Sequence, residues 1–208
     1  MNKVFAIHAV VALTGIAAAQ QEEFVIAAVA PATVEGGGFY EVQFWADFSN
    51  TGFVDGLSAI SAFAVDAFGN ANAAAVSDFL YADWVAVDPN NPEPTINGVN
   101  VEDIYGGQLA NLFGILNPDI DLSNPILLFS FTVEATYNYG SVITYTAGNP
   151  HPNGGLSYYP DSEDAATIIA PNDANATLSF ISANTTIIPA PPSIALLGLG
   201  ALAARRRR

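Results

Sequence analysis

The chain has 208 residues, no cysteine, and 20 acidic against 5 basic residues, which gives a formal net charge of −15 at pH 7. The basic residues are Lys3 and four arginines at 205–208, so the body between them carries only acidic charge. Such a body repels phosphate backbones and anionic lipid surfaces, which excludes nucleic-acid binding. The lack of cysteine excludes disulfides, thiolate nucleophiles and thiolate metal sites.

Residues 1–19 have the three parts of a secretory signal peptide. Lys3 makes the start basic, Val4–Ile16 is an apolar run, and Ala17–Ala19 is a small-residue exit. This order predicts cleavage before Gln20 and export of the protein. The body, residues 20–186, is then long enough for one domain with a hydrophobic core.

The first half of the body begins with segments typical of strands. Phe24–Val29 is an apolar run, and Tyr40–Phe48 alternates apolar and polar side chains with a period of two, which indicates a strand with one buried and one wet face. Trp45 falls on the wet face of that strand. Gly56–Phe68 predicts another strand, although its alanines leave a helix open, and Asp66–Asn70 is typical of a turn.

The middle of the body is less regular. Asn72–Trp84 is ambiguous between a strand alone and a short helix followed by a strand, and the prolines of Asp88–Pro94 predict a rigid loop. Ile96–Ile104 reads as a weak strand broken at an Asn-Gly pair. Gln108–Ile115 favours a single helical turn, and Asn117–Pro125 is a second acidic loop.

The second half predicts further strands. Ile126–Thr136 is a strong strand, and Ser141–Thr146 is expected to be its hairpin partner. Late strands are expected at Ala166–Ile169 and Ala176–Ile181, with Thr185–Ile188 as an edge strand or stalk. Short strands at this spacing predict an all-β fold, an antiparallel β-sandwich of cohesin-like or jelly-roll-like type. The run at residues 126–136 loosely resembles the later strands of cohesin-like sandwiches.

One acidic loop is a candidate calcium site. Asp119, Asp121 and Ser123 place oxygen side chains at alternate positions, as calcium loops do. The loop is not an EF-hand, because Asn124 stands where that motif needs glycine and Ser130 where it needs glutamate. A looser calcium site and a simply solvated loop both stay open, since the acidic charge of the body can be screened by salt or paired with divalent cations.

Two tryptophans are candidates for binding sugars. The rings of Trp45 and Trp84 could stack on the apolar faces of sugar rings, or they could cover the edges of the core. Periodicity places Trp45 outward and leaves Trp84 undecided. The body has a single histidine, His151, which lies between two prolines and is expected to be a surface residue of a loop.

The tail, residues 187–208, has a proline motif, an apolar run at 194–204 and a basic stop. This order resembles the C-terminal sorting signal of the PEP-CTERM family of exported bacterial proteins. The resemblance implies a transient hold in the inner membrane, processing by an exosortase-type enzyme, and delivery to the cell surface or the extracellular space. Ala190 stands where that family usually has glutamate. The residues that carry the signal are Pro189, Ala190, Pro191, Arg205, Arg206, Arg207 and Arg208.

These observations support two hypotheses from different classes. The first is an exported structural or adhesive protein of the cell envelope or extracellular matrix, processed at its tail. The second is a carbohydrate-binding module that recognises exopolysaccharide through exposed aromatic rings, with calcium ordering its loops. Neither is an enzyme: the body has many carboxylates without a spacing that selects a catalytic pair, and it lacks the basic residues of most other mechanisms.

Overall fold

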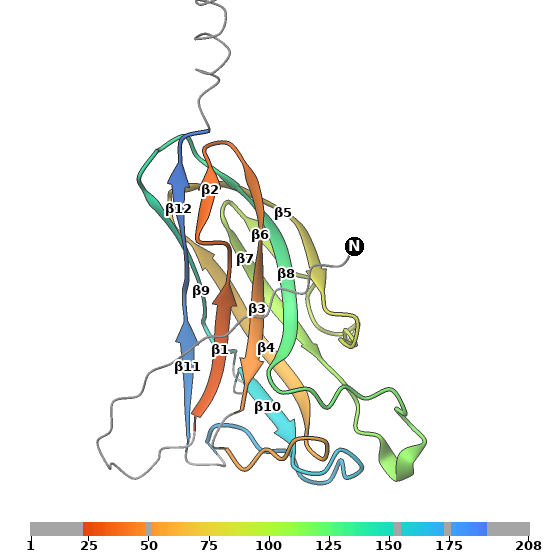
Figure 1. Cartoon of the computed structure of the whole chain (residues 1–208). Helices are drawn as coiled ribbons and strands as arrows, with labels where there is room; N and C mark the ends of the chain where they lie inside the picture. The colour runs from red at the N-terminus through yellow and green to blue at the C-terminus, as the bar shows by residue number, and fades with distance from the viewer. Residues whose placement is uncertain (1–22, 49–50, 152–154, 173–175, 191–208) are drawn as a thin grey trace, which may run out of the picture.

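The computed structural model describes residues 23–48, 51–151, 155–172 and 176–190, which contain twelve strands in two sheets and one short 3₁₀ turn, η1 (Leu112–Gly114) (Figure 1). The predicted signal peptide and the apolar and basic parts of the tail lie outside these residues. Within them, we find no helix with the length and hydropathy that a membrane span requires.

The first sheet has five strands in the order β11-β1-β3-β8-β5. Its strands are β1 (Glu23–Val29), β3 (Phe39–Asp47), β5 (Ala73–Tyr81), β8 (Ile126–Ala135) and β11 (Thr177–Ile181). The second sheet has seven strands, in the order β2-β12-β9-β4-β7-β6 with β10 paired to β4. Its strands are β2 (Thr33–Glu35), β4 (Ala59–Gly69), β6 (Thr95–Asn97), β7 (Asn100–Gly107), β9 (Val142–Gly148), β10 (Leu156–Tyr159) and β12 (Ala183–Ile188).

The predicted all-β sandwich is confirmed, with a mixed rather than wholly antiparallel pairing. β1 pairs with β11 and β2 pairs with β12 in parallel, while the other strand pairs are antiparallel. Figure 1 shows the cause: the last two strands, in blue, return to lie beside the first two, in red. Thr185 Oγ1 also donates a hydrogen bond of 2.8 Å to the carbonyl of Pro31, so the two ends of the body hold each other.

Aromatic side chains from both sheets fill the space between them. The alternation predicted over Tyr40–Phe48 is confirmed, because Tyr40, Val42, Phe44 and Ala46 are buried while Trp45 is only half-buried. The Phe44 ring stacks on Phe129 of β8 with centroids 4.6 Å apart. Phe63 of β4, in the second sheet, lies 6.1 Å from Phe129 between ring centroids. Packing of this kind buries the apolar faces of both sheets, which is the main stabilising term of such a fold.

The structure decides two segments that the sequence left open. β4 is a strand buried on both faces, so it lacks the alternation of a half-buried strand, and the helical alternative for Gly56–Phe68 is excluded. The turn predicted at Asp66–Asn70 is wrong, since β4 continues to Gly69 and pairs there with β9. Asn72–Trp84 contains β5 and no helix. Two register shifts interrupt its pairing with β8 and explain the broken pattern.

The hairpin predicted between Ile126–Thr136 and Ser141–Thr146 is also wrong. β8 is already paired on both sides, with β3 and β5, so no edge is free for the next strand. The chain therefore crosses to the second sheet, where β9 pairs with β4 and β12. β12, expected at an edge, lies between β2 and β9. Of the strand expected at Ala166–Ile169, one bridge from Ile169 to Tyr158 is present.

Candidate functional site

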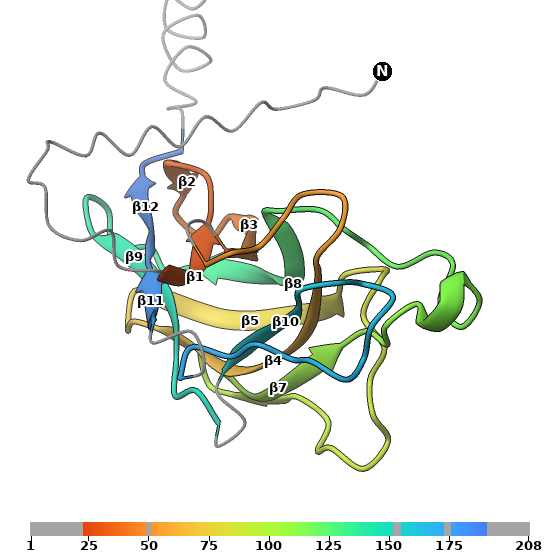
Figure 2. The ribbon, with the colours of Figure 1, turned by 90° about the horizontal axis from the view of Figure 1, so that it is seen from below.

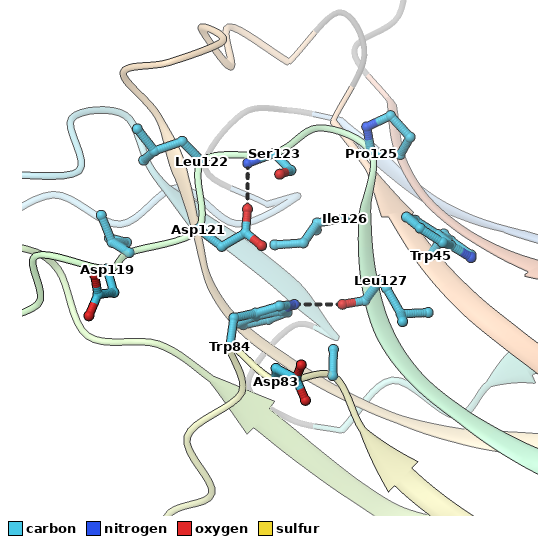
Figure 3. Close-up of a pocket in the computed structure, with 12 residues that line it drawn as sticks. Trp45, Asp83, Trp84, Asp119, Asp121, Leu122, Ser123, Pro125, Ile126 and Leu127 are labelled. Carbon is cyan, nitrogen blue, oxygen red and sulfur yellow. Dashed lines mark hydrogen bonds between the residues drawn. The ribbon is translucent and has the colours of Figure 1, made fainter. Parts of the chain in front are cut away.

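An open cleft of about 970 Å³ lies at the end of the first sheet where β8 begins, between β3 and the segment after β5 (Figure 3). Its walls come from Trp45 on β3, from residues 82–84 after β5, and from residues 119–123 and 125–127, which include part of the second acidic loop. The tertiary fold thus gathers in one place both tryptophans and both aspartates, Asp119 and Asp121, that the sequence singles out.

The Trp84 ring is fixed by a hydrogen bond to the backbone and by packing against the core. Its Nε1 donates a hydrogen bond of 2.6 Å to the carbonyl of Leu127 (Figure 3). Its ring packs edge-on against Phe63, with centroids 6.0 Å apart. The indole therefore covers part of the core, as the second interpretation of the sequence allowed, and also lines the cleft with a fixed orientation.

Trp45 lies on the outer face of the first sheet. It pairs across the ladder with Leu127, and its Nε1 donates a hydrogen bond of 3.2 Å to the side chain of Gln43. Figure 3 shows Trp45 and Trp84 on opposite sides of Leu127. The outward position predicted for Trp45 is confirmed. The two rings lie on either side of the same residue of β8, Leu127.

One buried side chain, Gln108, fixes the acidic loop through hydrogen bonds. Its Nε2 donates hydrogen bonds of 2.8 Å to the carbonyl of Asp121 and 3.2 Å to that of Ile60. Its Oε1 accepts a hydrogen bond of 2.9 Å from the Asp121 amide. Because an unpaired amide is costly inside a protein, this double contact fixes the loop relative to β4. No sequence pattern indicated this role of Gln108.

The predicted calcium ligands lie on the rim of the cleft. One carboxylate oxygen of Asp121 accepts a hydrogen bond of 2.8 Å from the Ser123 amide, which shapes the turn. In the part of the chain that the structure describes, no third carboxylate or histidine joins Asp119 and Asp121, since the single group of three such ligands lies elsewhere. Calcium binding by this loop stays a prediction.

The arrangement suits a polar ligand with apolar faces. The indole rings offer flat apolar surfaces, and Asp83, Asp121 and Ser123 supply hydrogen-bond acceptors at the rim. Sugars combine an apolar ring face with hydroxyl donors, so they match both kinds of surface. Among the described residues, those that line the cleft include aspartates and no lysine, arginine or histidine, which disfavours anionic ligands.

A second polar cluster, which the sequence did not reveal, lies on the second sheet. His151 has a side chain only 14% exposed, so the expectation of a surface loop residue is wrong. Its Nε2 lies 3.2 Å from a carboxylate oxygen of Asp66, and its Nδ1 lies 2.7 Å from the hydroxyl oxygen of Tyr105. Burial, followed by the charges of Asp103 and Asp66, raises the pKa of Tyr105 above its ordinary value.

Comparison with known proteins identifies no family. No protein-family profile matches the chain, and neither does any curated protein. A solved structure of related shape is the sixth cohesin of scaffoldin B from Acetivibrio cellulolyticus, determined in complex with a mutant Cel5 dockerin. The two chains are 10% identical with a TM-score of 0.47, over 81% of this chain and 99% of the cohesin. Similarity at this level says nothing about the ligand or partner of this protein.

Proposed function

We propose that the protein is an exported adhesive component of the cell envelope or extracellular matrix that binds polysaccharide through the tryptophan cleft. The observation that supports this is the convergence of Trp45 and Trp84 on one open cleft, each with its indole nitrogen hydrogen-bonded. Rings that are already oriented lose little conformational entropy when a ligand stacks on them.

The charge of the cleft narrows the class of polysaccharide. Asp83, Asp119 and Asp121 are acceptors of hydrogen bonds, and they would repel uronic acids, sulfated sugars and phosphorylated sugars. Hydroxyl groups of neutral sugars donate to carboxylates without such a penalty. The expected ligand is therefore a neutral exopolysaccharide, contacted through a few sugar units.

The two ends of the chain support the proposed location. The basic start and apolar run of residues 1–19 are suited to export, and the tail resembles a PEP-CTERM sorting signal. Under this proposal an exosortase-type enzyme removes the tail with Arg205–Arg208. The delivered protein is then purely anionic, because all remaining charged side chains except a protonated histidine are carboxylates.

Binding is testable by affinity electrophoresis of the protein comprising residues 20–188 in gels that contain neutral glucans, mannans or galactans. At least one polysaccharide should retard the protein, and Trp45→Ala should weaken the affinity by at least about tenfold, as loss of a stacking aromatic anchor does. Trp45→Phe, which keeps a ring, should lie between the two. Trp84→Ala is less informative because Trp84 also packs on Phe63.

Phe39→Ala is the matched control for this experiment. Phe39 lies on the same strand, β3, and is 67% exposed, but it pairs near the opposite end of β8 with Glu134. Its truncation should leave the affinity unchanged. Equal retardation of wild type and Trp45→Ala, or no retardation by any of the neutral polysaccharides, would contradict the proposal that this cleft binds sugars.

Processing is testable by mass spectrometry of the protein released from a host that has an exosortase-type enzyme. The released chain should begin at Gln20 and end before Arg205, near Pro189. A variant with both Pro189→Ala and Pro191→Ala should stay with the membrane fraction, whereas Pro171→Ala, outside the tail, should be released normally. A released wild-type chain that still carries Arg208 would contradict the proposal.

A further inference from the structure

Three potential metal ligands from separate segments meet on the second sheet. Asp66 comes from β4, Asp103 from β7, and His151 from the residues that follow β9. One ligand atom from each lies within 4.8 Å of the other two. This cluster lies outside the residues that line the tryptophan cleft.

Asp66 is the buried member of the cluster, with 4% of its surface exposed. One carboxylate oxygen accepts hydrogen bonds from the Asp103 amide at 2.8 Å and faces His151 Nε2 at 3.2 Å. The other accepts from the side-chain amide of Asn149 at 2.5 Å. A buried carboxylate is costly unless it is paired, and neutral donors offset only part of that cost.

Charge balance is the second argument. The body contains no lysine or arginine, so His151 is its only side chain that can become a cation. Asp66 and Asp103 therefore bring two carboxylates together with no lysine or arginine of the body to pair with them. A divalent cation would balance both carboxylates at once, with the imidazole as a further ligand.

The orientation of the His151 imidazole also favours a metal site. Tyr105 holds Nδ1 at 2.7 Å, so Nε2 faces the carboxylates. A histidine that binds a metal commonly has its other ring nitrogen fixed by such a partner. In a tetrahedral site with bonds of about 2.0–2.1 Å, two ligand atoms lie about 3.4 Å apart. The 3.2 Å between His151 Nε2 and Asp66 is close to that spacing, and rotation of the Asp103 side chain would complete the set.

We propose that Asp66, Asp103 and His151 bind one divalent transition-metal ion, with Zn²⁺ as the best match. An imidazole nitrogen and two carboxylates suit zinc-class ions, whereas calcium requires six to eight oxygen ligands, far more than this cluster offers. The ion ties β4 and β7 to the segment after β9. Because the chain has no cysteine, it cannot form the disulfides that stabilise many exported proteins, and the metal bridge would stabilise the fold instead.

The test uses the chelator-treated protein comprising residues 20–188 and Zn²⁺ itself. Isothermal titration should show one saturable site, and the melting temperature should rise by roughly 5–10 °C when free Zn²⁺ is about 100 times Kd. Co²⁺ should give the visible absorption of a tetrahedral nitrogen and oxygen site. Ca²⁺ at equal concentration should cause a much smaller thermal shift.

Variants separate this site from general cation binding by an acidic protein. Asp103→Asn and His151→Gln should each remove the saturable Zn²⁺ site and the Co²⁺ spectrum. Asp103→Asn keeps the backbone amide that Asp66 uses, so folding should survive. The control is Asp161→Asn with Glu163→Gln on an exposed turn, which should keep both the saturable site and the spectrum. Zn²⁺ binding that stays equal in all variants, or no saturable binding to wild type, would overturn the proposal.

Discussion

Replacing Phe129 by alanine is expected to lower the free energy of unfolding by about 3–5 kcal/mol, the cost of emptying a large aromatic site in a packed core. Phe129 is fully buried at the centre of the sandwich. Its neighbours come from both sheets: Phe44 at 4.6 Å, Phe79 at 5.7 Å, Phe63 at 6.1 Å and Phe131 at 6.5 Å between ring centroids. The cavity left by alanine would therefore weaken contacts in several strands together. Urea denaturation followed by tryptophan fluorescence measures the loss.

The control for Phe129 is Phe113, the same residue type on the η1 turn. Phe113 is 86% exposed, and Figure 2 shows this turn projecting away from the sandwich. Phe113→Ala should change the stability by no more than about 0.5 kcal/mol. A Phe129→Ala loss as small as that of Phe113→Ala would mean that the aromatic cluster is not the stabilising core described above.

The second large effect is expected from Gly107→Ala, at the end of β7. A Cβ there would be forced against the carbonyl oxygen of Ser61 and would lie 3.1 Å from the Cα of Ala62. Both are backbone atoms of β4, so the two strands must move apart. We expect a loss of about 2–3 kcal/mol, the upper part of the range for overpacking. Differential scanning calorimetry of the folded variant measures it.

Gly107→Ala should also impair ligand binding. The next residue, Gln108, donates its backbone amide to Ser61 O at 3.0 Å and holds Asp121 with its side chain. A shift of β7 therefore reaches the acidic loop of the cleft. Gly148→Ala is the control, because its Cβ would meet only the Phe68 ring, at 3.1 Å, and a side chain can rotate. Equal effects of the two substitutions would show that backbone approach at Gly107 is not limiting.

The strand predicted most directly is β3, which has one wet face; β8 was also predicted, and β4 was predicted with a helix left open. β3 alternates buried and less buried residues along its whole length, and the sequence shows the same alternation. β4 and β10 are buried on both faces, so neither has a period of two, and β10 was missed altogether. In β5, register shifts between Ala73 and Ala75 and between Ser77 and Leu80 disturb the pattern. Bulges of this kind depend on the neighbouring strand, which no local signal specifies.

Which strands pair with one another could not be predicted from the local sequence for a similar reason. The turn between β8 and β9 looks like a hairpin, but whether two consecutive strands pair depends on which edges are free. β3 and β5 occupy both edges of β8, and both strands precede it in the chain. The same long-range pairing brings β11 and β12 beside β1 and β2.

The sequence by itself determined the all-β class, the acidic body and the residues worth testing, Trp45, Trp84, Asp119 and Asp121. Composition and periodicity are local properties, and they carry that information directly. Only the tertiary structure decided that these four residues line one cleft. It also decided that His151 lies against Asp66 of β4, 85 positions away in the chain. Burial and proximity arise from contacts between distant segments, so the cleft and the cluster of Asp66, Asp103 and His151 could be recognised only once the two sheets were assembled.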